Sequence, residues 1–371
     1  MRKRNNGYMR LLPLGATLLL MTAALMAAGP AGADSPQTSR LWQELHPKQY
    51  TGPKAAAADT DWHPDILAGY EARQINLGNS FDGPVRCTVI RKLTPSHCGR
   101  AVLYVHGFND YFFQKEMGER YVAEGYNFYA VDLRRYGRSL QPWQYPFDVR
   151  EIDEYFTDID SALRVVRRDG NTDVTLSGHS TGGLTVLAFA AERGARVGVR
   201  RVVTDSPFLE WNFNGFYRNV LLPAVSAWGA LSPGTMIDQG DCDAYAQSLL
   251  RRYHGEWEYD TDWKMIVSPP VKAGWIRAIS RGQSRLMRHA GNITVPVLVM
   301  HSDRGGHACT WDSACMSEDI VLDPAMLRKR GVKMGRNPQV SAISGGIHDL
   351  ILSSPKVREA AYDTIFAFMR K

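Results

Sequence analysis

VTLSGHSTGG, residues 174–183, is the most informative stretch of this sequence. It follows the pattern of a short buried strand, Val174–Ser177, a G-x-S-x-G turn centred on Ser180, and a helix that opens on small residues. A sharp strand-to-helix turn of this kind projects the serine hydroxyl above the sheet, and the helix N-terminus favours negative charge developing beside it. We therefore predict that Ser180 is a nucleophile, and that His179 packs beside it or orients it.

The segments on both sides of this turn alternate between strand-like and helical patterns. Such alternation is typical of a mostly parallel sheet covered by helices on both faces. The expected strands are 101–106, 126–132, 174–177, 201–204, 295–301 and 339–344, and the expected helices are 114–124, 152–168, 182–193 and 356–370.

Two regions interrupt the alternation. Residues 34–100 have alternating β patterns around the turn Asp82-Gly83-Pro84, which predicts an N-terminal extension and an antiparallel hairpin at the sheet edge. Residues 207–290 are rich in aromatic side chains and have no clear strand, so we predict a helical lid insertion there. The sheet-and-helix core would then consist of residues 101–206 and 291–371.

A serine nucleophile needs a base and an acid. In proteins with this type of turn the acid and the histidine follow the serine along the chain, and His348 is the only histidine late enough, just after the last predicted strand. Asp303, at the end of the strand that follows the insertion, is the first choice for the acid, because a carboxylate there could orient the imidazole and stabilise its cation. Asp319 is the second choice, and Asp205 is a fallback.

Backbone N–H groups complete the predicted site. An oxyanion hole needs two such donors that converge on one point. Thr181 directly follows the nucleophile, and Phe108 stands in the loop after the first parallel strand, where Gly107 allows a close approach of the chain. We predict that these two residues supply the donors.

The N-terminus has the three parts of a secretory signal peptide, residues 1–33. Arg2-Lys3-Arg4 precede an apolar run, and the small residues Ala31-Gly32-Ala33 predict cleavage after Ala33. An uncleaved anchor helix is the alternative, but Pro13 and Gly15 interrupt the run. The expected mature protein is secreted or periplasmic, with no stable membrane anchor.

Charge and cysteine content limit the possible partners. The formal net charge is +6, but four of these charges lie in the first 33 residues, which have no acid, so the remainder carries only +2 and does not indicate nucleic-acid binding. In an oxidising compartment close cysteine pairs tend to form disulfides. We expect the pairs Cys87–Cys98 and Cys309–Cys315, with Cys242 free, and no metal, because no spacing matches a structural zinc site.

Four motifs together resemble a known family. They are His106-Gly107-Phe108, the run from Asp132 to Ser139 (DLRRYGRS), Gly178–Gly183, and Gly346-Ile347-His348. They resemble the serine α/β-hydrolases, and among these the group of monoacylglycerol lipase, lysophospholipase and the S33-type serine aminopeptidases. The resemblance covers residues 100–206 and 293–371 and implies the α/β-hydrolase fold, a Ser–Asp–His mechanism through an acyl-enzyme, and no cofactor. This chain departs from the family at Arg135 and in the loop inserted after Asp303.

Three functions fit these residues. The first is an exported hydrolase of small-molecule or lipid-like carboxylic esters, with apolar or aryl acyl groups favoured by the aromatic insertion. The second is an S33-like aminopeptidase, which would need carboxylates at the entrance to hold a substrate amino group. The third is a non-catalytic binding protein on the same scaffold. Acidic residues of the insertion could serve the second function: Glu210, Asp238, Asp241, Asp243, Glu256, Glu258, Asp260 and Asp262.

Overall fold

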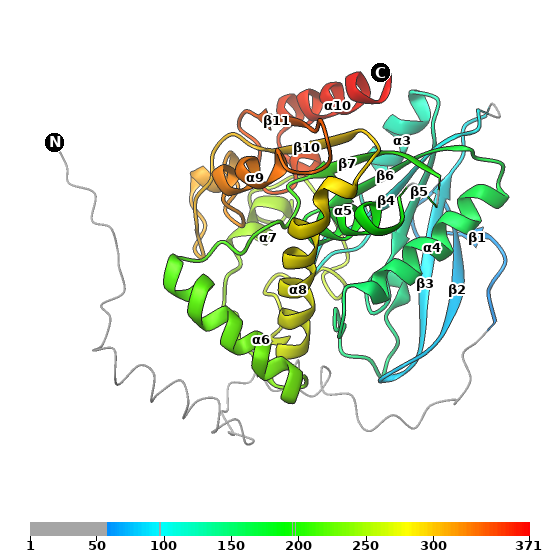
Figure 1. Cartoon of the computed structure of the whole chain (residues 1–371). Coiled ribbons are helices and arrows are strands. Elements are labelled where there is room, and N and C mark those ends of the chain that lie inside the picture. The colour runs from blue at the N-terminus through cyan, green and yellow to red at the C-terminus, as the bar shows by residue number, and fades with distance from the viewer. Residues whose placement is uncertain (1–57, 96–97, 195, 197) are drawn as a thin grey trace, which may run out of the picture. The chain divides into compact units, whose positions relative to one another are not determined.

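A nine-stranded sheet is the centre of the structure, a computed structural model that describes residues 58–95, 98–194, 196 and 198–371 (Figure 1). The strand order is β1-β2-β3-β5-β4-β6-β7-β10-β11, in which β5 to β11 run parallel and β1 to β3 join as an antiparallel edge. The strands are β1 (His63–Pro64), β2 (Glu71–Ser80), β3 (Gly83–Lys92), β4 (Arg100–Val105), β5 (Asn127–Asp132), β6 (Asp173–His179), β7 (Val199–Asp205), β10 (Val297–Ser302) and β11 (Gln339–Ile343).

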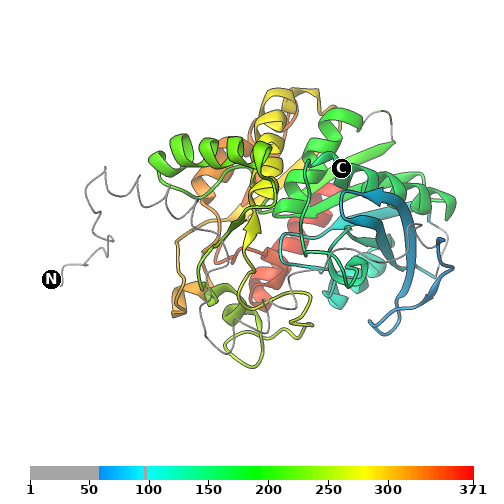
Figure 2. The ribbon, with the colours of Figure 1, turned by 90° about the horizontal axis from the view of Figure 1, so that it is seen from below.

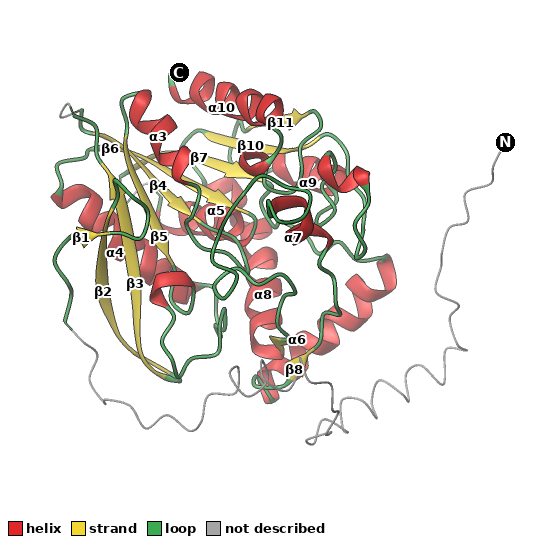
Figure 3. Cartoon of the chain, turned by 180° about the vertical axis from the view of Figure 1, so that it is seen from behind, coloured by secondary structure: helices red, strands yellow, loops and turns green. Residues whose placement is uncertain are grey.

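Helices cover both faces of this sheet (Figure 3). On one face lie α4 (Asp153–Arg168), α5 (Thr181–Arg193) and α8 (Ala273–His289), and on the other lie α3 (Lys115–Ala123) and α10 (Pro355–Met369). Strand β4 shows the alternation that makes this possible, because Leu103 packs into the first core and Val102 and Tyr104 into the second. The predicted α/β-hydrolase fold and its antiparallel edge hairpin are confirmed.

The insertion between β7 and β10 is only partly helical. Before α8 and the 3₁₀ helix η3 (Ala290–Asn292), which complete this segment, its elements are the π-helix η2 (Tyr217–Leu221), α6 (Leu222–Leu231), β8 (Met236–Ile237), α7 (Ala244–Leu249) and β9 (Val271–Lys272). The pair β8–β9 was not predicted, nor was α9 (Pro324–Gly331), which follows β10. Helix α6 packs against α8, and α8 in turn packs against α5 in the core layer (Figures 1 and 2). The insertion is thus joined to the sheet through α8.

The structure shows how the turn after β5 accommodates Arg135, one of the departures from the family pattern. It adopts φ 64° in the turn after β5, a left-handed conformation that usually favours glycine. Its side chain is fully buried and its guanidinium pairs with Asp82, while Phe147 N–H donates to its carbonyl over 3.0 Å. The contacts with Asp82 and Phe147 hold Arg135 in this backbone conformation.

The N-terminal prediction concerns residues that the structure does not describe. Residues 1–33, the predicted signal peptide, lie outside the described residues. Within the part of the chain that the structure does describe, none of the helices combines the length and apolar character that crossing a bilayer requires.

Candidate active site

Ser180 sits in a strained turn between β6 and α5. Its backbone has φ 51° and ψ −116°, a left-handed conformation for a non-glycine residue. The turn is tight: a Cβ at Gly178 would lie 2.6 Å from Gly182 O, and a Cβ at Gly182 would overlap the carbonyl oxygens at the end of β4. The small residues are therefore required by backbone contact, and they leave the Ser180 side chain at the carboxyl edge of the sheet.

His348 reaches this serine from the segment between β11 and α10. Its Nε2 lies 3.0 Å from Ser180 Oγ, and its side chain is almost completely buried. The loop that holds it is anchored to the end of β7, since Leu350 N–H donates to Asp205 over 3.0 Å. The structure thus brings together the two residues on which the sequence prediction depends, which are far apart along the chain.

The acid beside His348 is Asp319. Its Oδ2 lies 3.0 Å from His348 Nδ1, and its Oδ1 accepts hydrogen bonds from Val321 N–H (2.9 Å) and Leu322 N–H (2.8 Å). The carboxylate is fully buried, and each of its oxygens has a partner. A carboxylate held in this way orients the imidazole and stabilises its cation.

This geometry contradicts the choice of Asp303 as the acid. Its carboxylate accepts hydrogen bonds from Ser344 Oγ (2.8 Å) and Gly345 N–H (2.9 Å) in the turn after β11, on the partly exposed side of the loop. Although burial raises the pKa of Asp303, these hydrogen bonds hold it below its usual value. The chain leaves β10 at Asp303, passes through the inserted loop, and returns at Asp319 beside Gly305. The inserted loop therefore moves the acid position further along the chain.

The loop after β4 lies directly against Ser180. His106 accepts Leu133 N–H at Nε2 (3.1 Å), so its Nδ1 carries the proton and donates to Gly107 O (2.8 Å). A Cβ at Gly107 would lie 3.2 Å from Ser180 Cβ, so any larger residue would be in tight contact with the serine side chain. Phe108 follows in the pocket wall, and Thr181 is the first residue of α5, where an N–H has no acceptor within the helix. Both predicted oxyanion donors therefore belong to segments that border Ser180.

A second buried cluster lies behind Ser180 and His348. His179 Nε2 is 3.9 Å from Asp349 Oδ2, and the rings of His179 and His348 have centroids 4.8 Å apart. A carboxyl oxygen of Asp349 lies within 4.8 Å of one of Asp205, and burial raises the pKa of Asp349. Burial, followed by the charge of Asp349, raises the pKa of Asp205 well above its usual value, and burial lowers the pKa of His179, which keeps it neutral.

The same cluster is the place where a metal could bind. His179, Asp205 and Asp349 offer ligand atoms that lie within 4.8 Å of one another. However, Leu350 N–H donates to Asp205 and Ile351 N–H donates to Asp349, so a backbone group already occupies one oxygen of each carboxyl group. The expectation of no metal stays a prediction.

A pocket of about 290 Å³ opens in front of Ser180 and His348. Its wall comes from the insertion, the loop after β10, and the loop after β4 (residues 106–110), which carries the predicted donor Phe108 and is called the oxyanion loop below. The lining side chains are mostly apolar or aromatic and include Phe108, Tyr245, Leu249, Tyr259, Met265, Ile266, Ile320 and Val321. Lys264 also lines it, and nothing in the sequence singled that residue out, since its partner Asp110 is 154 positions away.

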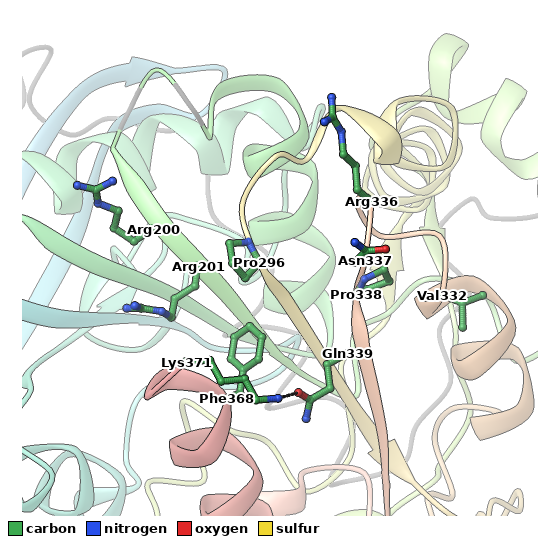
Figure 4. A pocket seen from close by; sticks show the side chains of 10 residues that line it. All are labelled: Arg200, Arg201, Pro296, Val332, Arg336, Asn337, Pro338, Gln339, Phe368 and Lys371. Carbon is green, nitrogen blue, oxygen red and sulfur yellow. Dashed lines mark hydrogen bonds between the residues drawn. The ribbon is translucent and has the colours of Figure 1, made fainter.

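A larger hollow of about 670 Å³ lies at the opposite edge of the sheet, where β7, β10 and β11 begin. Four of its lining residues are cationic, but Figure 4 shows that Arg200 and Arg336 point away from each other, and Lys371 bonds to Gln339 over 2.9 Å. The charges do not converge on one point, so this hollow does not compete with the pocket at Ser180 as a candidate active site.

The disulfide differs from both predicted pairs. Cys242 of the insertion is bonded to Cys309 of the loop after β10, whereas Cys87, Cys98 and Cys315 are free. The Cys87–Cys98 prediction assumed that the strands flanking residues 94–96 form a hairpin, but β5 lies between β3 and β4 in the sheet. Cys315 is buried in the 3₁₀ helix Ser313–Met316, where its thiol contacts Asp312. The disulfide therefore joins one wall of the pocket to the loop that carries Asp319.

Comparison with protein families agrees with this geometry. The family model described as serine aminopeptidase, S33, matches residues 96–306, which is more than half of the chain. This chain belongs to the serine aminopeptidase S33 family. As an S33 family member it is a serine hydrolase with the α/β-hydrolase fold, as the four sequence motifs predicted.

Solved structures of the same fold include two lipases and an esterase. A soluble variant of monoglyceride lipase from Saccharomyces cerevisiae, in complex with a substrate analog, has a TM-score of 0.60 and 17% identity, over 79% of this chain and 92% of that one. Monoacylglycerol lipase of Paleococcus ferrophilus has a TM-score of 0.55 and 19% identity, over 76% and 97% of the two chains. A thermophilic esterase from Thermogutta terrifontis has a TM-score of 0.52 and 17% identity, over 80% and 98%. A search of curated proteins gives no significant match to this S33 family member.

Proposed function

We propose that the protein hydrolyses carboxylic esters through Ser180, His348 and Asp319. His348 takes the Ser180 proton as Oγ attacks the ester carbonyl, and the N–H groups of Phe108 and Thr181 stabilise the oxyanion. The imidazolium then protonates the leaving alcohol, which departs and leaves an acyl-enzyme. Water activated by His348 attacks this ester and releases the acid and free Ser180.

One observation carries this proposal. The hydrogen-bonded series from Ser180 Oγ to His348 Nε2, and from His348 Nδ1 to Asp319 Oδ2, has two links of 3.0 Å each. Nucleophile, base and orienting carboxylate are thus within proton-transfer reach, in a buried site beside an open pocket.

The pocket favours an ester over an aminopeptidase substrate. Among the described residues that line it, Asp110 is the only carboxylate, and Lys264 Nζ pairs with it at 2.9 Å. A peptide amino terminus would need an unpaired carboxylate at the site, and the acidic residues of the insertion that could have served are not in the pocket wall. The mostly apolar lining fits an uncharged aliphatic or aryl acyl group, and the volume of about 290 Å³ fits a short one.

A direct comparison of substrates tests this proposal. Wild type and Ser180→Ala would be given p-nitrophenyl esters of increasing acyl length and aminoacyl-p-nitroanilides. We expect turnover of the short esters, little turnover of the anilides, and none of either by Ser180→Ala. Faster anilide turnover would establish the aminopeptidase instead, and a folded wild type that turns over neither would favour a binding protein.

We also propose that the protein is exported, with its signal peptide removed after Ala33. The charged start, apolar run and small-residue site support this, and the Cys242–Cys309 disulfide suits an oxidising compartment. N-terminal sequencing of the protein recovered outside the cytoplasm should begin at Asp34. A protein that retains Met1 and stays with the membrane would be an anchored form.

A further inference from the structure

The oxyanion loop is attached to the insertion by two consecutive residues on each side. Asn109 Oδ1 accepts Met265 N–H over 2.8 Å, and Asn109 Nδ2 donates to Met265 O over 2.8 Å and to Ser268 Oγ over 3.2 Å. The next residue, Asp110, accepts Lys264 Nζ at Oδ1 over 2.9 Å. Both contacts join segments that are more than 150 residues apart in the chain.

Asp110 transmits this contact to the backbone beside the nucleophile. Its second oxygen, Oδ2, accepts Gly107 N–H over 3.3 Å, so the carboxylate closes the loop that contains Phe108. The backbone of Asn109 is left-handed, with φ 48°, a conformation that needs support from its surroundings. The orientation of Phe108 N–H therefore depends on side-chain contacts that the insertion supplies.

Lys264 is confined at this point. Its side chain is 8% exposed and its Nζ lies 5.7–5.8 Å from the ring centroids of Phe113, Tyr245 and Tyr259. A buried ion pair of this kind adds little net stability, but loss of one partner leaves an uncompensated charge in the pocket wall. The Lys264–Asp110 pair therefore matters more for the position of the Asp110 carboxylate than for the net stability of the fold.

We propose that Lys264 is a positioning residue of the oxyanion hole: through Asp110, together with the Asn109–Met265 contacts, the insertion holds Phe108 N–H in place for the transition state. The inference rests on the proposed role of Phe108. As a consequence, the insertion cannot move away from the core without displacing Phe108 N–H from the oxyanion hole. The segment around Lys264 is therefore part of the catalytic apparatus and not a freely opening cover.

The test compares Lys264→Met with a matched variant, Lys272→Met. Lys272 also lies in the insertion and pairs with a buried core carboxylate, Asp148, at 2.8 Å, but Asp148 is not in the oxyanion loop. Each variant would be assayed for kcat and KM with a p-nitrophenyl ester, for inhibition by a trifluoromethyl ketone, whose hemiketal oxyanion uses the hole, and for thermal stability.

We expect Lys264→Met to lose ~10- to 100-fold in kcat and to bind the ketone more weakly by a similar factor, with KM little changed. Lys272→Met should keep both quantities within about twofold of wild type. Wild-type kcat and ketone affinity in Lys264→Met, or equal losses in both variants, would overturn the inference. Absence of ester turnover in wild type would instead contradict the proposed function.

The double variant Asp110→Asn/Lys264→Met covers the case in which the single variant does not fold. It buries no unpaired charge, so it should be folded, yet it cannot bridge the insertion to Gly107 through an ion pair. We expect it to bind the ketone more weakly than wild type. Full recovery of ketone affinity and kcat would show that Lys264 only neutralises a buried charge, and the positioning role would be excluded.

Discussion

Asp319, not Asp303 at the end of β10, holds the imidazole of His348, through a 3.0 Å contact between Oδ2 and Nδ1. The two carboxylates lie in different environments. Asp319 is fully buried with hydrogen bonds to both oxygens, whereas Asp303 is about one-third exposed and serves the turn after β11.

The first prediction separates these two carboxylates. Asp319→Asn should lower kcat on the order of 10⁴-fold, the scale found when the acid of such a triad is replaced by an amide, because the imidazole is then held in the wrong tautomer. Asp303→Asn, the matched control, should stay within about twofold of wild type. Steady-state kinetics with a p-nitrophenyl ester measures both. A larger loss in Asp303→Asn would return the acid to the position first chosen from the sequence.

The disulfide gives a second prediction. It closes a separation of 67 residues, which corresponds to about 4 kcal/mol of unfolding free energy in the chain-entropy account. The double variant Cys242→Ser/Cys309→Ser should therefore unfold at a lower temperature and lose activity, because the loop carrying Asp319 is released from the pocket wall. Reductant should lower the melting temperature of wild type but not of this variant. Cys315→Ser is the control, and if it also abolished the reductant effect, the pairing would be wrong.

The buried pair of Asp205 and Asp349 predicts a pH dependence of stability. Because the pKa of Asp205 is raised in the folded state, the folded protein keeps its proton where the unfolded chain has lost it. Stability should fall as pH rises from the ordinary value of 3.8 toward the raised pKa, by about 1.4 kcal/mol per pH unit for one proton. Asp205→Asn removes that proton exchange.

Denaturant unfolding between about pH 4 and pH 8 measures this effect. The unfolding free energy of wild type minus that of Asp205→Asn should decrease as the pH rises across that range. A difference that is independent of pH would mean that Asp205 is ionised in the folded protein.

The turn at Ser180 supplies a fourth prediction. Gly182→Ala would place a Cβ against the carbonyl oxygens of Val105 and His106, so the strand-to-helix turn would have to shift. We expect a loss of 1–3 kcal/mol or more in stability, by the order of overpacking effects, and a greater loss of activity. Gly234→Ala is the control, since its Cβ would meet nothing within 4 Å. Normal activity in Gly182→Ala would show that the turn is not confined in this way.

Local patterns were sufficient to select Ser180 and His348 as candidates. Strand, turn and helix around Ser180 occupy neighbouring residues, and a serine followed later by a histidine is the chain order of this fold. Asp319 could not be chosen in this way, because its place depends on the path of an inserted loop that has no regular period. A preference for the first acid after β10 therefore selected Asp303.

Contacts between distant segments could not be predicted from the sequence for a different reason. The Cys242–Cys309 bond and the Lys264–Asp110 pair each join the insertion to a separate part of the core. No strand pattern predicts how an insertion folds over a sheet. The cysteine pairs were instead chosen by closeness in sequence, and this failed for Cys87 because β5 separates the strands on either side of the expected turn.

The most direct test of the proposed catalysis is covalent labelling with a fluorophosphonate, followed by mass-spectrometric mapping of the modified peptide. A single adduct on Ser180 is expected, absent in Ser180→Ala and formed much more slowly in His348→Ala. A correctly folded wild type that forms no adduct, or an adduct on another residue, would contradict the assignment of Ser180 as the nucleophile.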